Sequence, residues 1–335
     1  MRKLLLSLCL LALPVFAAAQ GRETLLTPDG TLFSVETNVT NNEASTLSAH
    51  LILRSQTGAD VVREVVPATL DRGAHVNPAI AYDAESKTLF VFWLRQLGLM
   101  SSQLMVACRD ANGTWNAPTA FGEQFDFREN LRIAVTRKVV DQDGTVSATP
   151  AVSVHLVWWE FDTETGRESA QYAMLSIENG RVESLHHLEL SSFTADAAGE
   201  PLAADADRSV LKQPLMFTAP QQDSVLVVFG EAAKEELHQV RVRPTKIVSD
   251  GRLRVPVGRH ERSNRAPSFR VASNTRIEGI YGDSTRIALY TRDASRVEYV
   301  ILKDGAWTAP RSIALDEQIT SGAAIDALRR LLDEH

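Results

Sequence analysis

The chain is poor in cysteine and has no excess of positive charge, and each shortage excludes a class of protein. Only Cys9 and Cys108 are present among 335 residues, so the chain is not a small domain held together by disulfides. Its stability must come from an ordinary hydrophobic core. The formal net charge is −7, which argues against binding through overall charge to nucleic acid or anionic lipid. We therefore expect no nucleic-acid partner.

Motifs of the common cofactor and metal sites are also missing. The sequence has no P-loop, no dinucleotide-binding glycine fingerprint and no Gly-x-Ser-x-Gly elbow, which removes most nucleotide and serine-hydrolase functions. The acidic segment 195–207 lacks the Asp-x-Asp-x-Asp-Gly pattern of a calcium loop. His186 and His187 are adjacent on an expected strand and would point to opposite faces. We expect no cofactor and no metal.

Long apolar runs are scarce, and the one at the N-terminus has the layout of a signal peptide. Two basic residues precede apolar residues 4–16, and alanines occupy 17–19. This run is too short to span a membrane, and no later segment is long and apolar enough, so we expect no membrane span. Cleavage after Ala19 would remove two positive charges and no negative one, changing the net charge from −7 to −9. The sequence thus predicts a signal peptide over 1–19 and a periplasmic or extracellular protein.

What the chain has in abundance is short β-forming runs, which recur in groups of four. The second runs of the groups are Thr31–Val35, Thr88–Trp93, Val154–Trp159, Val225–Phe229 and Arg286–Tyr290. The third runs are Ser48–Arg54, Gln103–Arg109, Ala170–Ile177, Leu237–Val242 and Arg296–Lys303. Each third run ends in a glycine-containing hairpin signal, and a fourth run follows. Five repeats of one four-strand pattern predict an all-β fold, a β-propeller of about five antiparallel blades over residues 20–316. A sixth, degenerate blade around 122–150 stays open.

Two hairpins share a longer motif. Residues 112–118 (NGTWNAP) and 304–310 (DGAWTAP) both follow the pattern [N/D]-G-x-W-x-A-P. With Asp110 ahead of it, the segment Cys108-x-Asp110-x-Asn112-x-Thr114-Trp115 resembles the Asp-box (BNR) repeat of sialidase-like propellers. The resemblance implies a structural turn in which the Asp caps backbone amides and the Trp packs between blades. It implies the fold and not sialidase chemistry, because no convincing Arg-Ile-Pro segment accompanies it.

The C-terminal residues 317–335 are expected to contain a helix. Ile325, Leu328, Leu331 and Leu332 lie on one stripe of a helix that starts at Ser321, which Ser321 or Thr320 would cap. We expect this helix to pack against the propeller, with a partner-binding tail as the alternative.

A possible functional face follows from four second runs, each of which ends in an aromatic residue with a charged residue two positions later. The pairs are Trp93 with Arg95, Trp158 with Glu160, Phe229 with Glu231, and Tyr290 with Arg292. A spacing of two keeps both side chains on one side of a strand, so the charges would gather near the propeller mouth. They either pair with neighbouring charges or bind a polar ligand there, with Trp159 available to stack on a sugar ring. Glu160 and Glu231 are the carboxylates that a glycosidase would use.

A second candidate is the basic stretch between Arg241 and Arg276. It includes Arg259, Arg262 and Arg265, which form either a solvated edge or an anion-binding patch. Cys108 lies in an apolar run and is expected to be buried rather than nucleophilic.

Taken together, these features favour a secreted, non-catalytic propeller that binds a glycan or a protein partner through its loop-rich face. The alternative is a glycoside hydrolase or lyase with carboxylates at the mouth. A third possibility is an assembly factor that uses the C-terminal helix.

Overall fold

The structure is a computed structural model. It describes residues 22–41, 47–71, 73–98, 100–121, 127–137, 152–164, 168–178, 181–193, 213–218, 225–231, 236–243, 246–254, 277–283, 286–303, 306–316 and 319–333. The predicted signal peptide, the acidic segment 195–207 and the candidate anion patch (Arg259, Arg262 and Arg265) lie outside the described residues.

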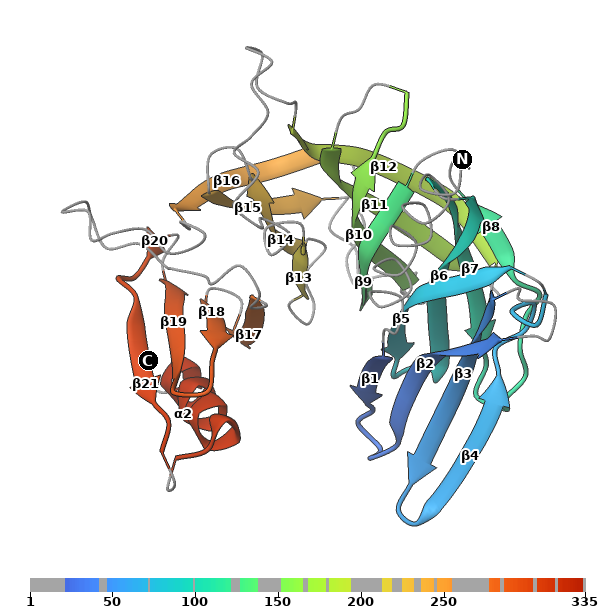
Figure 1. Ribbon diagram of the computed structural model, residues 1–335, viewed down its shortest axis with the longest axis horizontal. Coiled ribbons are helices and arrows are strands. Elements are labelled where there is room, and N and C mark those ends of the chain that lie inside the picture. The colour runs from blue at the N-terminus through green and yellow to red at the C-terminus, as the bar shows by residue number, and fades with distance from the viewer. Residues whose placement is uncertain are drawn as a thin grey trace, which may run out of the picture. The chain divides into compact units, whose positions relative to one another are not determined.

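Strands dominate the described chain and occur in five consecutive groups (Figure 1). The first group is β1 (Arg22–Leu26), β2 (Leu32–Asn41), β3 (Leu47–Thr57) and β4 (Asp60–Val65). The second is β5 (Ala74–Asp83), β6 (Thr88–Gly98), β7 (Ser101–Arg109) and β8 (Thr119–Phe121). The third is β9 (Phe127–Arg137), β10 (Val152–Phe161), β11 (Glu168–Glu178) and β12 (Arg181–Phe193). The fourth is β13 (Leu215–Thr218), β14 (Val225–Glu231), β15 (Glu236–Arg243) and β16 (Lys246–Arg254). The fifth is β17 (Glu278–Asp283), β18 (Arg286–Arg292), β19 (Arg296–Lys303), β20 (Ala306–Trp307) and β21 (Arg311–Ala314).

Within each group the strands pair in the order of the chain. The third group has the order β12-β11-β10-β9 and the fourth β13-β14-β15-β16, while β20 and β21 share the outer edge of β19 in the fifth. One parallel pairing, Ala49 with Ala74, joins β3 to β5 and links the first two groups into one sheet. Apart from Thr31, which precedes β2 by one residue, the predicted second and third runs lie within these strands, so the prediction of strands at these runs is confirmed. The interval suggested for a sixth blade contributes β9 to the third sheet.

The chain packs as two compact units. The first comprises residues 1–156, 160–166 and 174–185, and the second comprises 157–159, 167–173 and 186–335. The single propeller domain over residues 20–316 stays a prediction.

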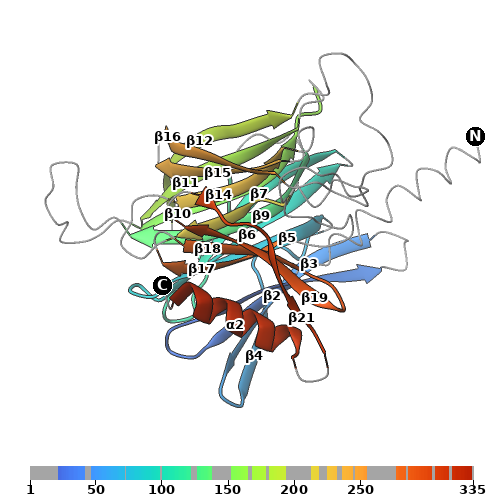
Figure 2. The same cartoon turned by 90° about the vertical axis from the view of Figure 1, so that its left-hand side faces the viewer.

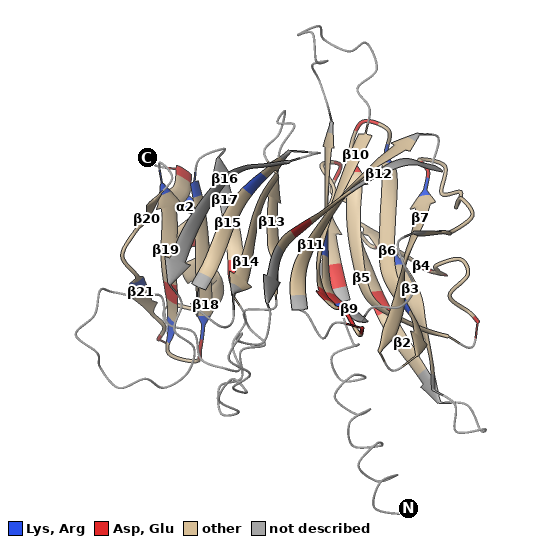
Figure 3. Ribbon diagram, turned by 90° about the horizontal axis from the view of Figure 1, so that it is seen from above, with Lys and Arg blue, Asp and Glu red and all other residues tan. Residues whose placement is uncertain are grey.

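The core of the first unit forms where alternating apolar side chains of its strands meet. A cluster of buried residues combines Val35 and Leu53 of the first group with Val91, Trp93 and other residues of the second. Charged residues are a minority along these strands, and most of the length of β5, β6 and β7 is tan in Figure 3. Cys108 is buried as expected, and burial raises the pKa of its thiol to about 12, which keeps the sulfur protonated and unreactive.

The hairpin between β7 and β8 has the turn that the Asp-box resemblance implied. The Asp110 carboxylate accepts the backbone N–H groups of Asn112 (2.9 Å) and Thr114 (2.8 Å). Gly113 has a positive φ of 83°, which a residue with a side chain rarely adopts. The Trp115 indole packs on the core cluster and donates to Glu64 of β4 at 3.0 Å. The motif therefore holds the second group of strands against the first, and its role is structural.

The C-terminal helix α2 (Ser321–Asp333) covers one face of the fifth sheet (Figure 2). Thr320 caps it, because its Oγ1 accepts the Ala323 N–H at 3.3 Å. The buried residues Ala324, Leu328 and Leu332 pack on an apolar face of that sheet. The apolar stripe is thus used inside its own unit, as expected. Among the described residues, α2 is the one helix, and it lacks the length and apolar character of a membrane-spanning segment.

Candidate functional site

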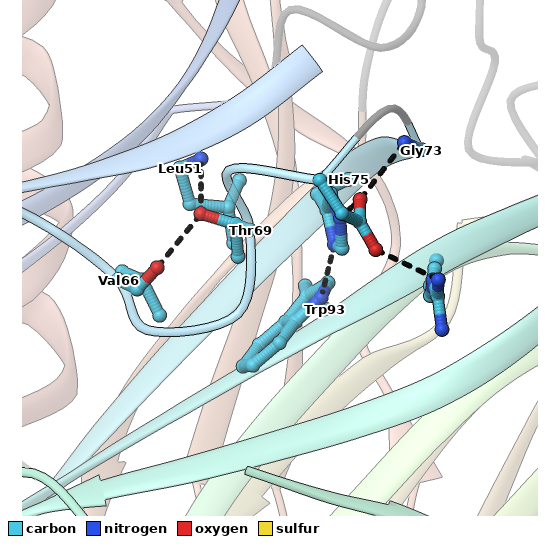
Figure 4. Close-up of polar contacts among 8 residues, drawn as sticks. Leu51, Val66, Thr69, Gly73, His75 and Trp93 are labelled. Atoms are coloured by element: carbon cyan, nitrogen blue, oxygen red, sulfur yellow. Dashed lines mark hydrogen bonds and ion pairs between the residues drawn. The ribbon is translucent and has the colours of Figure 1, made fainter. Parts of the chain in front are cut away.

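The segment between β4 and β5 is tied down at several points and forms a rigid platform. We call residues 66–73 the connector; residue 72 is outside the described set. The buried Thr69 hydroxyl accepts the Leu51 N–H at 3.2 Å and donates to the Val66 carbonyl at 2.8 Å (Figure 4). The Val66 N–H donates to the Leu51 carbonyl at 3.0 Å, and the Ala49 N–H donates to the Gly73 carbonyl at 3.4 Å. Two backbone hydrogen bonds and one to the Thr69 hydroxyl therefore hold the connector against β3.

A chain of four side chains runs from the core to the surface beside the connector. The buried Trp93 indole Nε1 donates to His75 Nδ1 at 2.8 Å (Figure 4). His75 Nε2 lies 2.7 Å from Asp71 Oδ1, and the Arg95 guanidinium lies 2.7 Å from Asp71 Oδ2. The Gly73 N–H also donates to Asp71 Oδ1 at 2.8 Å. The aromatic residue and the charge that end this second run are thus joined, through His75 and Asp71, on one side of the sheet.

The charge state of this chain follows from burial and hydrogen bonding. Burial lowers the pKa of His75, and the Asp71 hydrogen bond opposes this effect only in part. For Asp71, partial burial raises the pKa. The hydrogen bonds from His75 and Gly73 and the Arg95 charge together lower it by more, so the net shift is downward. Near neutral pH the titratable groups of this hydrogen-bonded row are therefore a neutral imidazole, an ionised carboxylate and a guanidinium.

Three exposed aliphatic side chains lie in the chain segments that this ion pair joins. We call them the aliphatic patch: Leu70 (72 % exposed), Leu97 (45 %) and Met100 (48 %). Leu70 precedes Asp71 in the connector, and Leu97 follows Arg95 by two residues. Met100 lies in the β6–β7 hairpin. The Arg95–Asp71 contact therefore holds the two segments that carry this patch together, and both partners are 39 % exposed.

The third and fifth sheets have ion pairs in corresponding positions, with different residues. The Arg292 guanidinium at the end of β18 lies 3.3 Å from Glu278, the first residue of β17. The Tyr290 hydroxyl donates to the other Glu278 oxygen at 2.6 Å, and burial together with this bond raises the pKa of Tyr290. At the end of β10, Glu160 pairs with Arg128 of β9 at 2.8 Å. Each described charge of the predicted set thus has an oppositely charged partner. Arg128 and Glu278 lie on the neighbouring strand, and Asp71 lies in the connector before β5.

Two of the predicted ligand-binding residues are buried. Trp159 is only 2 % exposed, so its ring face does not reach solvent, and the expectation that it stacks on a sugar does not fit its place in the core. The Glu160 side chain is 12 % exposed and its partner Arg128 is 4 % exposed. Arg128 also donates to the Ser102 carbonyl at 2.8 Å. Glu160 is therefore part of a buried structural ion pair.

The last candidate carboxylate is only partly described. The backbone of Glu231 ends β14 and pairs with Glu236 of β15, while its side chain lies outside the described set. Its aromatic partner Phe229 stacks on His238, with ring centroids 5.5 Å apart. Among the described side chains, no group of three His, Cys, Asp or Glu residues gathers as a metal site would require.

Sequence reasoning found the ends of the second runs but missed their partners. Asp71, Arg128 and Glu278 all lie at or just before the first strand of a group, opposite the end of the second strand. They could have been found by searching the start of each first strand for a residue whose charge is opposite to that of the residue at the end of the second strand. His75 and Leu70 carry no comparable signal, because they matter through three-dimensional contacts.

Comparisons with known proteins bear on the fold. No family model matches the chain, and no curated protein matches it. Among solved structures, the Hadza microbial sialidase Hz136 is similar over 90 % of this chain and 59 % of its own length, with a TM-score of 0.51 and 13 % identity. The β-propeller domain of the Trilobed protease from Pyrococcus furiosus covers 88 % of this chain and 84 % of its own, with a TM-score of 0.31 and 8 % identity. The chain thus spans about three fifths of the sialidase, and that likeness supports the β-propeller class alone.

Proposed function

We propose that this chain is an exported, non-catalytic β-propeller that binds a protein partner through the connector and the aliphatic patch. The five strand groups would be its blades. The observation that carries the proposal is the rigid display of exposed Leu70 beside the half-exposed Arg95–Asp71 pair. Apolar anchors on a preorganised backbone, ringed by polar groups, are typical of protein-binding surfaces.

A polypeptide partner suits this surface better than a glycan does. Every described Trp, Tyr and Phe side chain is buried or partly buried, whereas sugar rings are usually held against an exposed aromatic face. Aliphatic side chains such as Leu70 and Met100 instead match apolar side chains of a peptide. The glycan alternative enters the experiment below as a competing outcome.

Catalysis by the candidate carboxylates has little support in the described chain. A glycosidase needs one carboxyl whose pKa is raised so that it can act as an acid. The described carboxyls with a clear shift, Asp29, Asp71 and Asp293, all have lowered pKa values. Glu160 is sequestered by Arg128. These observations favour binding over hydrolysis.

The test is selection of ligands on the mature chain with a matched pair of variants. A displayed peptide library and a glycan array are screened at pH 7.5 against wild type, Leu70→Asp and Leu26→Asp. Leu26 is an exposed leucine of β1 outside the aliphatic patch and serves as the control. We expect selected peptides to bind Leu70→Asp at least roughly tenfold more weakly, about 1.4 kcal/mol, and Leu26→Asp as well as wild type. Glycan binding without peptide binding, or equal loss in both variants, would overturn the proposal.

A further inference from the structure

We propose that His75 is a proton-controlled positioning residue: its neutral ring locks the connector, and a proton on Nδ1 releases it. The consequence for partner binding rests on the proposed function above. The lock itself is a property of the fold and can be measured without any partner.

The hydrogen bonds around His75 admit one protonation state. The Trp93 indole can only donate, so His75 Nδ1 must accept from it. The other nitrogen, Nε2, therefore carries the proton and donates to Asp71. Both bonds of the ring are satisfied only when it is neutral. The sequence position of Asp71, four residues before His75, makes the connector part of this arrangement.

Protonation would place two donors face to face. The proton on Nδ1 would point at the Trp93 N–H across 2.8 Å, and both groups are fully buried. A buried donor without an acceptor is strongly unfavourable, and so is a buried charge that cannot reach water. The protonated ring must therefore move out of its pocket. Because Asp71 and Gly73 follow the ring through their shared hydrogen bonds, the connector moves as well.

The charges that face His75 decide how the proton is shared. Asp71 favours the charged ring, while Arg95 of β6 and His50 of β3 oppose it. The Asp71 pKa is lowered, so its carboxylate stays ionised as the pH falls through the range in which histidine titrates. A transition between neutral pH and pH 5 at this site would thus belong to a histidine.

The size of the effect follows from linkage. In the locked state the pKa of His75 lies below its ordinary value of 6.5, and a released ring would have that ordinary value. The released state therefore gains population as the pH falls below 6.5. Between pH 7.5 and pH 5.5 the opening constant of the connector should rise by as much as about tenfold.

Hydrogen exchange of two backbone amides measures this opening directly. The Leu51 N–H is bonded to Thr69 and the Ala49 N–H to Gly73, so both lose protection when the connector leaves β3. After correction for the intrinsic pH dependence of exchange, we expect their protection to fall by up to about tenfold from pH 7.5 to pH 5.5. Unchanged protection at both amides would overturn the proposal. The amides of β18 and β19 in the second unit provide the internal reference.

A matched pair of variants identifies the titrating group. In His75→Gln the side-chain amide can accept from Trp93 and donate to Asp71 but cannot titrate, so the pH dependence should disappear. In His50→Gln, which changes the nearby and more exposed histidine, it should persist. Should His75→Gln fail to fold, the indole N–H resonance of Trp93 in the wild-type chain decides. A pH-independent chemical shift there would refute the lock.

Peptides selected at pH 7.5 test whether opening of the connector on protonation of His75 also weakens partner binding. Rebinding at pH 5.5 should be weaker by up to about tenfold, and equal binding at both pH values would show that the lock does not control the surface. If exchange shows the opening and no peptide is ever selected, the proposed function fails while the lock stands.

Discussion

The ion pair between Arg128 and Glu160 offers the most direct test of how the candidate carboxylate is used. Replacing Glu160 by Gln leaves the Arg128 charge buried, at 4 % exposure, with the Ser102 carbonyl and a neutral amide as its acceptors. Removing one member of a buried pair usually costs about 3–5 kcal/mol. Because at least these two acceptors remain, we expect the lower end, about 3 kcal/mol. For a unit of this size that lowers the Tm by roughly 6–12 °C.

The measurement is thermal unfolding of Glu160→Gln beside two controls. In Arg128→Met/Glu160→Leu both charges are replaced by apolar groups, and most of the lost stability should return, because a buried pair without its charges is often no less stable. Glu278→Gln breaks a half-exposed pair in the second unit and should cost less than about 1 kcal/mol. If Glu160→Gln unfolded at the wild-type temperature, the structural interpretation of the pair would be refuted. Glu160 would then return as a candidate for ligand binding or catalysis.

Two further predictions concern packing and acid stability. Gly279 faces the Phe217 ring so closely that an added Cβ would lie 2.3 Å from it, so Gly279→Ala should destabilise the second unit by about 1–3 kcal/mol in a chemical denaturation series. The double variant with Phe217→Leu should recover part of that loss, and a neutral Gly279→Ala would contradict the close approach. His155 is buried, and burial lowers its pKa from 6.5 to about 4. As the pH falls below 6.5 the unfolded chain therefore binds this proton before the folded chain does. The free energy of unfolding should decrease by about 3 kcal/mol as the pH falls from 6.5 to 4. Replacement by Gln should flatten that part of the stability–pH curve, and an unchanged slope would assign the acid sensitivity to other groups.

The fold was predictable because its signals are local. Each second and third run combines β-branched and aromatic residues over a strand's length and ends in turn residues, so the sequence alone placed Thr88–Trp93 and Gln103–Arg109 in strands. The Asp110 turn is equally local, since the carboxylate caps amides two and four residues ahead. Strand pairing in chain order then follows from short hairpins.

The candidate site was predictable only in part because its contacts join distant residues. The aromatic-and-charge spacing placed Trp93 and Arg95 on one side of a strand, but it could not show that Asp71 lies between them. Burial decided the rest. Glu160 has the same sequence setting as Arg95, and only the packing around Arg128 turns it from a surface group into a core one. Leu70 stands outside any regular run, so its exposure on a rigid segment had no signal in the sequence.

The helix that covers the fifth sheet has a consequence for what else can pack on that sheet. A four-stranded unit has two apolar faces, and an uncovered one is adhesive toward identical units of other molecules. Here α2 presents polar residues such as Asp326 and Arg329 outward and keeps its leucines against the sheet. The apolar face is therefore covered within the same chain. Another apolar surface could pack on this face only by displacing these thirteen residues.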